Sequence, residues 1–87
     1  AGWGLIWRAV DDAALLVEAA TLAARLAAGP TRGLGLTKRA IQAAAGNSLD
    51  AQLDLERDLQ REAGRTADYA EGVIAFLEKR QPEFSGK

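Results

Sequence analysis

Residues that end helices recur along the chain and divide it into four segments with helical periodicity. The helix-ending residues are Gly29-Pro30, Gly46-Asn47, Gly64 and Pro82. Glycine is frequent just after a helix, and proline cannot continue one. Between these positions apolar residues recur every three or four residues, as on one face of an amphipathic helix. The predicted helices are residues 13–28, 30–45 or 31–45, 49–63 and 67–80, and the tail after Pro82 is expected to be irregular.

Short polar side chains precede three of the four segments and are candidates for the helix N-cap. Ser48 and Thr66 stand directly before the third and fourth segments, and Asp11 and Asp12 precede the first. Such side chains accept hydrogen bonds from the free amide groups of the first helical turn. We therefore expect these four residues to mark where helices begin.

Two glycines, Gly33 and Gly35, fall inside the second predicted helix. Each weakens a helix by roughly 1 kcal/mol relative to alanine, so their presence needs a reason. Close packing of another backbone would explain them, because only glycine leaves that surface free of a side chain. We expect a close neighbour at this part of the helix.

The first ten residues have a different character and predict a short strand. Trp3, Leu5 and Trp7 alternate with Gly4 and Ile6, as on one face of a strand. No second strand is evident in the sequence, and a lone strand leaves its backbone groups without partners. The expected fold class is therefore mainly α, with one short N-terminal strand followed by about four helices. The unpaired strand, and a first residue other than Met, suggest a piece of a larger protein.

Composition argues against several classes of function. The chain has 87 residues, a net charge of −1 and a pI of about 5.3, so it lacks the basic character of nucleic-acid-binding proteins. It has no Cys and no His, which removes disulfides, thiol chemistry and the commonest metal ligand. No apolar run has the length of a membrane span. We expect a cytoplasmic protein that contacts neither nucleic acid nor membrane and holds no metal.

Three local patterns could in principle carry chemistry. The segment 29–38 is rich in glycine but lacks the spacing of a phosphate-binding loop. The acidic residues of the third helix alternate with arginines, as on a solvated helix face. Phe76 and Lys79 lie one helical turn apart, where an aromatic ring and a cation could hold a base and a phosphate. Spacing alone favours a packed ring and a lysine that complements the helix dipole.

Several motifs, taken in order, resemble the carboxy-terminal part of the enoyl-CoA hydratase/isomerase family, also called the crotonase superfamily. These motifs are Trp3-Gly4-Leu5-Ile6-Trp7-Arg8-Ala9-Val10, Ala27-Ala28-Gly29-Pro30, Leu36-Thr37-Lys38-Arg39-Ala40 and the stretch 71–86. The last stretch is the most specific, with Glu-Gly, Ala-Phe, Glu-Lys-Arg and Pro-x-Phe-x-Gly elements in order. Residues 54–69 most resemble the phenylacetate-degradation branch of the superfamily, which isomerises a ring epoxide carried on CoA.

The resemblance implies a division of the chain and a set of partners. Residues 1–10 would be the last strand of a spiral core that lies upstream, and residues 11–87 a helical segment for oligomerisation and for covering CoA. The subunits would form a trimer, often doubled to a hexamer. The substrate would be a CoA thioester, with no separate cofactor. The catalytic groups of the family lie in the spiral, so no catalytic residue is assigned in this chain.

The resemblance also gives two residues a role. In this family the Phe and Lys of the final helix often reach CoA bound by a neighbouring subunit, and Phe76 and Lys79 occupy those positions. Lys79 would meet a phosphate, and Phe76 the adenine or the acyl channel. Lys38, in the Leu-Thr-Lys motif, has no role that we can assign. The alternative is an independent helical module that binds a protein partner through its charged third helix.

Overall fold

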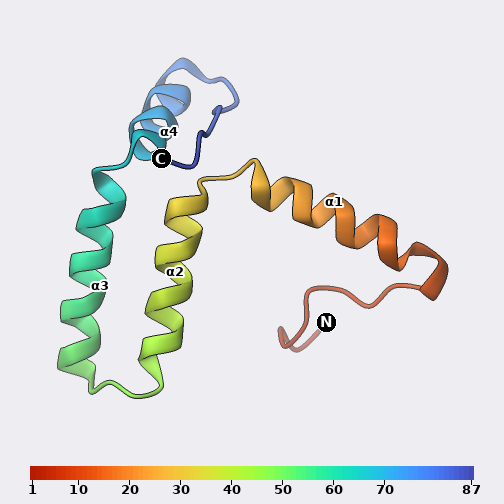
Figure 1. Cartoon of the computed structure of the whole chain (residues 1–87), viewed down its shortest axis with the longest axis horizontal. Helices are drawn as coiled ribbons and strands as arrows, with labels where there is room; N and C mark the ends of the chain where they lie inside the picture. Colours follow the sequence, from red (N-terminus) through yellow and green to blue (C-terminus); the bar gives the residue numbers. More distant parts are fainter.

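The computed structural model describes all 87 residues and contains four α-helices and one short 3-10 helix (Figure 1). The elements are η1 (Asp12–Ala14), α1 (Leu15–Ala27), α2 (Thr31–Ala44), α3 (Leu49–Gly64) and α4 (Ala67–Glu78). All four predicted helices are present, with ends within about two residues of those expected from the sequence. The mainly α class is thereby confirmed.

Helices α2 and α3 form an antiparallel hairpin, seen side by side in Figure 1. Leu36 of α2 and Leu59 of α3 are its buried apolar residues. At one end Arg32 pairs with Glu62 at 3.0 Å, and near the other Gln52 donates to the carbonyl of Ala40 at 2.9 Å. These contacts hold the two helices in a fixed register.

Two of the expected helix caps are confirmed. The Ser48 hydroxyl accepts a hydrogen bond from the Ala51 amide at 3.2 Å, and the Thr66 hydroxyl accepts from the Tyr69 amide at 3.1 Å. The prediction for Asp11 and Asp12 was wrong. Asp11 precedes a 3-10 turn without any capping hydrogen bond from its side chain, and Asp12 lies within that turn.

The N-terminal strand predicted for residues 1–10 does not form. This segment consists of turns and bends, with the Gly4 amide bonded to the Ala1 carbonyl at 3.1 Å. A strand needs a neighbour for its amide and carbonyl groups, and no second strand exists in the chain. The segment instead turns back toward α1, where Arg25 lies 5.9 Å from the Trp7 ring centre and Arg8 pairs with Glu18 at 2.9 Å.

The close neighbour expected at Gly33 and Gly35 is also missing within the chain. A β-carbon built at either position would have no atom within 4 Å outside its own helix. Both glycines therefore leave open backbone surface on α2.

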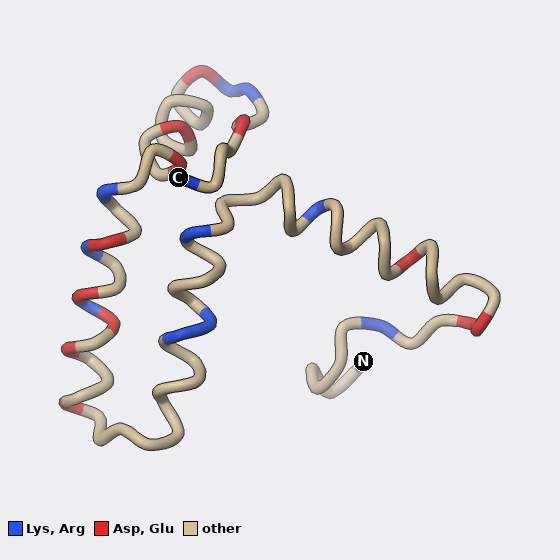
Figure 2. The backbone as a smooth tube through the Cα atoms, viewed as in Figure 1, with Lys and Arg blue, Asp and Glu red and all other residues tan.

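The arrangement is open rather than compact. Its radius of gyration is 16.1 Å, whereas a compact domain of this length has one of about 12 Å. Only Leu36, Leu59, Ala75 and Asp68 are buried. Helix α1 projects away from the hairpin and carries few charges, while acidic and basic residues alternate along α3 (Figures 1 and 2). No single helix meets the length and hydropathy of a membrane span, although the bent pair Asp12–Ala27 and Thr31–Ala44 does so when combined.

Candidate functional site

The C-terminal tail folds back along α4 and reaches from the end of that helix to its beginning. Asp68, in the first turn of α4, is 3% exposed. Its carboxylate accepts from the Ser85 amide at 2.7 Å and from the Gly86 amide at 2.8 Å. The Asp68 amide in turn donates to the carbonyl of Lys87 at 2.9 Å. The tail thus satisfies a free amide of the helix N-terminus, while the buried carboxylate is satisfied by tail amides.

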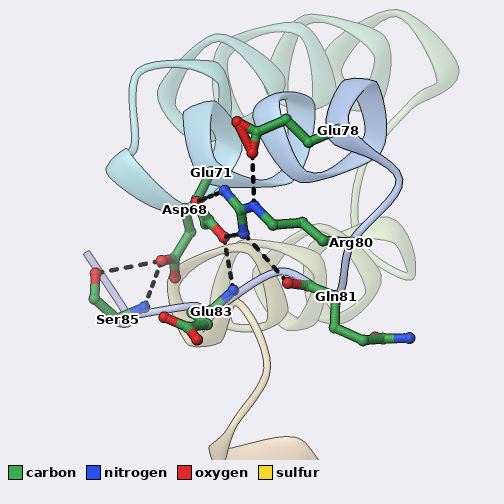
Figure 3. A network of polar contacts seen from close by, with 7 residues as sticks. All are labelled: Asp68, Glu71, Glu78, Arg80, Gln81, Glu83 and Ser85. Atoms are coloured by element: carbon green, nitrogen blue, oxygen red, sulfur yellow. Dashed lines mark hydrogen bonds and ion pairs between the residues drawn. The ribbon is translucent and has the colours of Figure 1, made fainter.

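A second carboxylate, one helical turn further along α4, holds the start of the tail (Figure 3). Glu71 accepts two hydrogen bonds from the Arg80 guanidinium, at 2.6 and 3.0 Å. It also accepts from the Glu83 amide at 2.7 Å. Arg80 is further held by Glu78, at 2.9 Å. This bidentate pairing of a guanidinium with a carboxylate is directional as well as charged, so it fixes the orientation of the chain that leaves α4.

The electrostatics follow from these contacts. The hydrogen bonds from Arg80 and from the Glu83 amide lower the pKa of Glu71 from its usual value of 4.5 to about 2. Glu71 and then Glu78 raise the pKa of Arg80 further above its usual range. Glu71 and Arg80 are therefore both charged at neutral pH. The ion pair between them is called the clasp below.

Beside this clasp lies an apolar groove of about 430 Å³. Its walls come from the start of α2, the end of α3, one face of α4 and the tail. The lining residues are Pro30, Gly33, Ala63, Thr66, Asp68, Tyr69, Gly72, Val73, Phe76, Leu77 and Phe84. Phe84 approaches Gly72, where an added β-carbon would lie 3.8 Å from the ring. The tail therefore supplies one wall of the groove.

The two residues assigned from the resemblance, Phe76 and Lys79, lie together at the end of α4. Phe76 lines the groove and is 82% exposed, so it is not a packed core residue. Lys79 directly follows the helix and has left-handed backbone, with φ 55° and ψ 43°. Its amide donates to the carbonyl of Phe76 at 3.2 Å. The Lys79 ammonium makes no ion pair and no hydrogen bond within the chain.

The other candidate positions lie elsewhere. Lys38 is exposed on α2, does not line the groove and makes no ion pair. Asp54 and Asp58 of α3 are exposed and pair with arginines of the same helix, as with Arg57 and Asp54 at 3.5 Å. No three His, Cys, Asp or Glu side chains are grouped so that they could hold a metal ion.

Sequence reasoning missed the part played by the tail, which was expected to be irregular. The tail has no regular secondary structure, yet Asp68 and Glu71 hold it through contacts across 9 to 18 positions. The sequence holds one indication of these contacts: the opposite charges of Glu71 and Arg80 lie on either side of the end of α4.

Comparison with known proteins gives the family. The profile described as enoyl-CoA hydratase/isomerase matches residues 1–87. The chain is 62% identical over 85 residues to a protein of Escherichia coli named 1,2-epoxyphenylacetyl-CoA isomerase, covering 98% of this chain and 32% of that protein. It is 48% identical over 84 residues to a probable enoyl-CoA hydratase of Rhodobacter capsulatus, covering 97% of this chain and 33% of that protein.

A solved structure agrees. The crystal structure of an enoyl-CoA hydratase from Geobacillus kaustophilus superposes with a TM-score of 0.88 at 33% identity, over 97% of this chain and 32% of that one. The chain therefore spans about a third of the length of these relatives. The family profile covers every residue, and by that match this chain belongs to the enoyl-CoA hydratase/isomerase family.

Proposed function

We propose that this chain is the helical segment of an acyl-CoA enzyme that covers the CoA thioester and joins subunits of a trimer or hexamer. The observation that carries the proposal is the grouping at the end of α4. The exposed ring of Phe76 lines an apolar groove, and Lys79, three positions further along the chain, makes no ion pair or side-chain hydrogen bond. An apolar cavity with a few polar groups at its edge is typical of a ligand site.

The chemistry of CoA fits these residues. The ligand combines phosphates, an adenine ring and an acyl chain on a flexible linker. Lys79 supplies a point charge for a phosphate, and Phe76 an apolar face for the ring or the acyl chain. The groove volume of about 430 Å³ lies within the range of small-molecule sites. Lys79 and Phe76 would act on CoA bound by a neighbouring subunit.

The exposed apolar surface supports the assembly role. Trp3, Leu5, Leu16, Phe76 and Leu77 are each more than two thirds exposed. Few soluble monomers leave so many large apolar side chains in water, and large exposed apolar surfaces mark interaction sites. The surface is therefore suited to docking on the rest of the enzyme and on its other subunits.

The identity of 62% with the Escherichia coli protein supports a finer proposal for the substrate. An epoxyphenylacetyl-CoA thioester, as in phenylacetate degradation, is the favoured acyl group. Proton transfer and stabilisation of the thioester enolate would rest on groups outside these 87 residues.

The test uses a complete enzyme that carries this chain in place of the matching third of the Escherichia coli isomerase. Lys79→Ala should weaken binding of CoA thioesters by about 1–2 kcal/mol, the scale of one charge-assisted contact. The loss should be smaller for pantetheine thioesters, which lack the nucleotide phosphates. Arg39→Ala, at an exposed cation on α2 without an ion pair, is the matched control. Equal losses for both ligands would show that Lys79 does not meet a phosphate.

A further inference from the structure

Lys79 is the only residue other than glycine with a positive φ angle, at 55°. A side chain with a β-carbon rarely adopts this left-handed conformation, because the β-carbon crowds the following carbonyl. Helices usually place glycine at such a reversal. The hydrogen bond from the Arg80 amide to the Ala75 carbonyl, at 3.0 Å, closes the turn but forms equally well around glycine. An additional contact must favour this turn when lysine occupies it.

Glu71 provides that contact from within α4. The residue directly after Lys79 is Arg80, whose guanidinium is bound in parallel by both oxygens of Glu71, at 2.6 and 3.0 Å. The Glu83 amide, past the turn, also donates to Glu71 at 2.7 Å. One carboxylate therefore holds the chain at two points beyond the reversal, as Figure 3 shows. The Glu71 side chain is only 22% exposed, so these contacts are partly shielded from water.

We propose that Glu71 is a positioning residue that fixes the left-handed turn at Lys79 and thereby directs the Lys79 ammonium toward a phosphate of the CoA thioester. The inference rests on the proposed contact between Lys79 and CoA and adds the residue that organises it. The low pKa of Glu71, about 2, keeps this carboxylate charged at any pH at which the enzyme would work. Without the clasp, residue 79 relaxes to right-handed or extended backbone, and the lysine stem leaves the helix in another direction.

The first test measures affinity in the complete enzyme described above. Dissociation constants for CoA and for pantetheine are compared in four forms: unchanged, Lys79→Ala, Glu71→Gln and the double variant. Lys79→Ala should weaken CoA binding about 10-fold and pantetheine little. Glu71→Gln should weaken CoA about 3-fold to 10-fold, again with little effect on pantetheine. The double variant should be no weaker than Lys79→Ala alone, because both changes remove one interaction.

Two controls separate this role from general loss of structure. Glu56→Gln removes an exposed carboxylate of α3 that makes no ion pair and should leave both affinities unchanged. Arg80→Gln breaks the same clasp from the other side and should reproduce Glu71→Gln; it replaces that variant if Glu71→Gln does not fold. Crystal structures of the complete enzyme report the φ angle of Lys79 directly, and this angle should leave the left-handed region in both variants.

The outcomes are distinct. If Lys79→Ala does not change the ratio of CoA to pantetheine affinity, both the proposed function and the positioning role fall. If it does, but Glu71→Gln leaves the ratio unchanged or multiplies the loss in the double variant, the positioning role alone is overturned. A left-handed Lys79 that persists in Glu71→Gln overturns it as well.

Discussion

The backbone amide of Glu83 donates a hydrogen bond to the carboxylate of Glu71 at 2.7 Å, which joins the tail to the middle of α4. Because Arg80 donates to the same carboxylate, the attachment of the first part of the tail, up to Glu83, depends on the charge of a single side chain. Its dependence on pH follows from that charge.

The pKa of Glu71 is lower in the folded chain, at about 2, than its usual value of 4.5. A group with a lowered folded pKa contributes stability above its unfolded pKa and loses that contribution as the pH falls. We therefore expect the first part of the tail, up to Glu83, to stay bound to Glu71 above about pH 4.5 and to be released from it progressively toward pH 2. The amide resonance of Glu83 should report this release, while that of Gly46, bonded to the Ala43 carbonyl, should not. In Glu71→Gln the Glu83 resonance should no longer change over this range; titration near 4.5 in the unchanged chain would contradict the expectation.

Gly86 should not tolerate a side chain. Its φ angle is 79°, and an added β-carbon would lie 2.6 Å from the Thr31 hydroxyl oxygen. Gly86→Ala should therefore destabilise the attached tail by about 1–3 kcal/mol, the cost of a strained backbone position. Hydrogen exchange of the Asp68 amide, which donates to the Lys87 carbonyl, measures the loss. Unchanged protection of that amide would show that the tail has room to adjust.

Gly35→Ala provides the opposite case. Gly35 lies within α2, and a β-carbon there would meet no atom within 4 Å. The substitution should stabilise the isolated chain by about 0.5–1 kcal/mol, the difference between glycine and alanine in a helix. Urea unfolding followed by circular dichroism is the measurement. If the same change lowers the stability of the complete enzyme, another part of that enzyme packs on this surface. A lower stability of the isolated chain would contradict the open surface described here.

The isolated chain should self-associate at micromolar concentration. Leu16 on α1 and Leu77 on α4 are 82% and 73% exposed, so apolar surface is available on more than one helix. Sedimentation equilibrium should show association, and Leu77→Ser should weaken it about 10-fold, since burial of one leucine contributes about 1.5–3 kcal/mol. Arg39→Ser should have no comparable effect. A monomer whose unfolding is independent of concentration would contradict this prediction.

The chain alone should not convert enoyl-CoA substrates. It contains no His or Cys, and Asp68 and Glu71 are engaged by the tail. Incubation with crotonyl-CoA and with an epoxyphenylacetyl-CoA source should give no turnover above background. The complete enzyme carrying this chain serves as the positive control. Turnover that disappears when a carboxylate of this chain is mutated would assign catalysis to these residues.

Local signals in the sequence predicted the helices well, because N-caps and helix-ending residues both act within a few positions of the chain. Ser48 and Thr66 each bond an amide three positions away, and glycine or proline ends the preceding helix. The strand at residues 1–10 was predicted wrongly. The alternating pattern indicates which side chains would share one face of a strand, but a strand also needs a neighbouring strand, which this chain lacks. The expected neighbour of Gly33 and Gly35 is likewise absent from this chain.

The site could be predicted only in part. Phe76 and Lys79 followed from the family resemblance. The structure places Phe76 in the lining of a groove and Lys79 directly after α4, and their contact with CoA stays a prediction. The tail contacts were not predictable from spacing. Asp68 binds amides 17 and 18 positions away, and no helical or strand period links such residues.

The order in which the helices pack has a kinetic consequence. Helix α2 packs against α3, and α3 against α4, so most contacts join elements adjacent in the chain. Chains dominated by such local contacts fold within microseconds to milliseconds. The helices should therefore form rapidly after dilution from denaturant, and the slow phase of refolding should be the encounter between separate molecules or surfaces. Its rate should rise with protein concentration, while the fast phase stays the same.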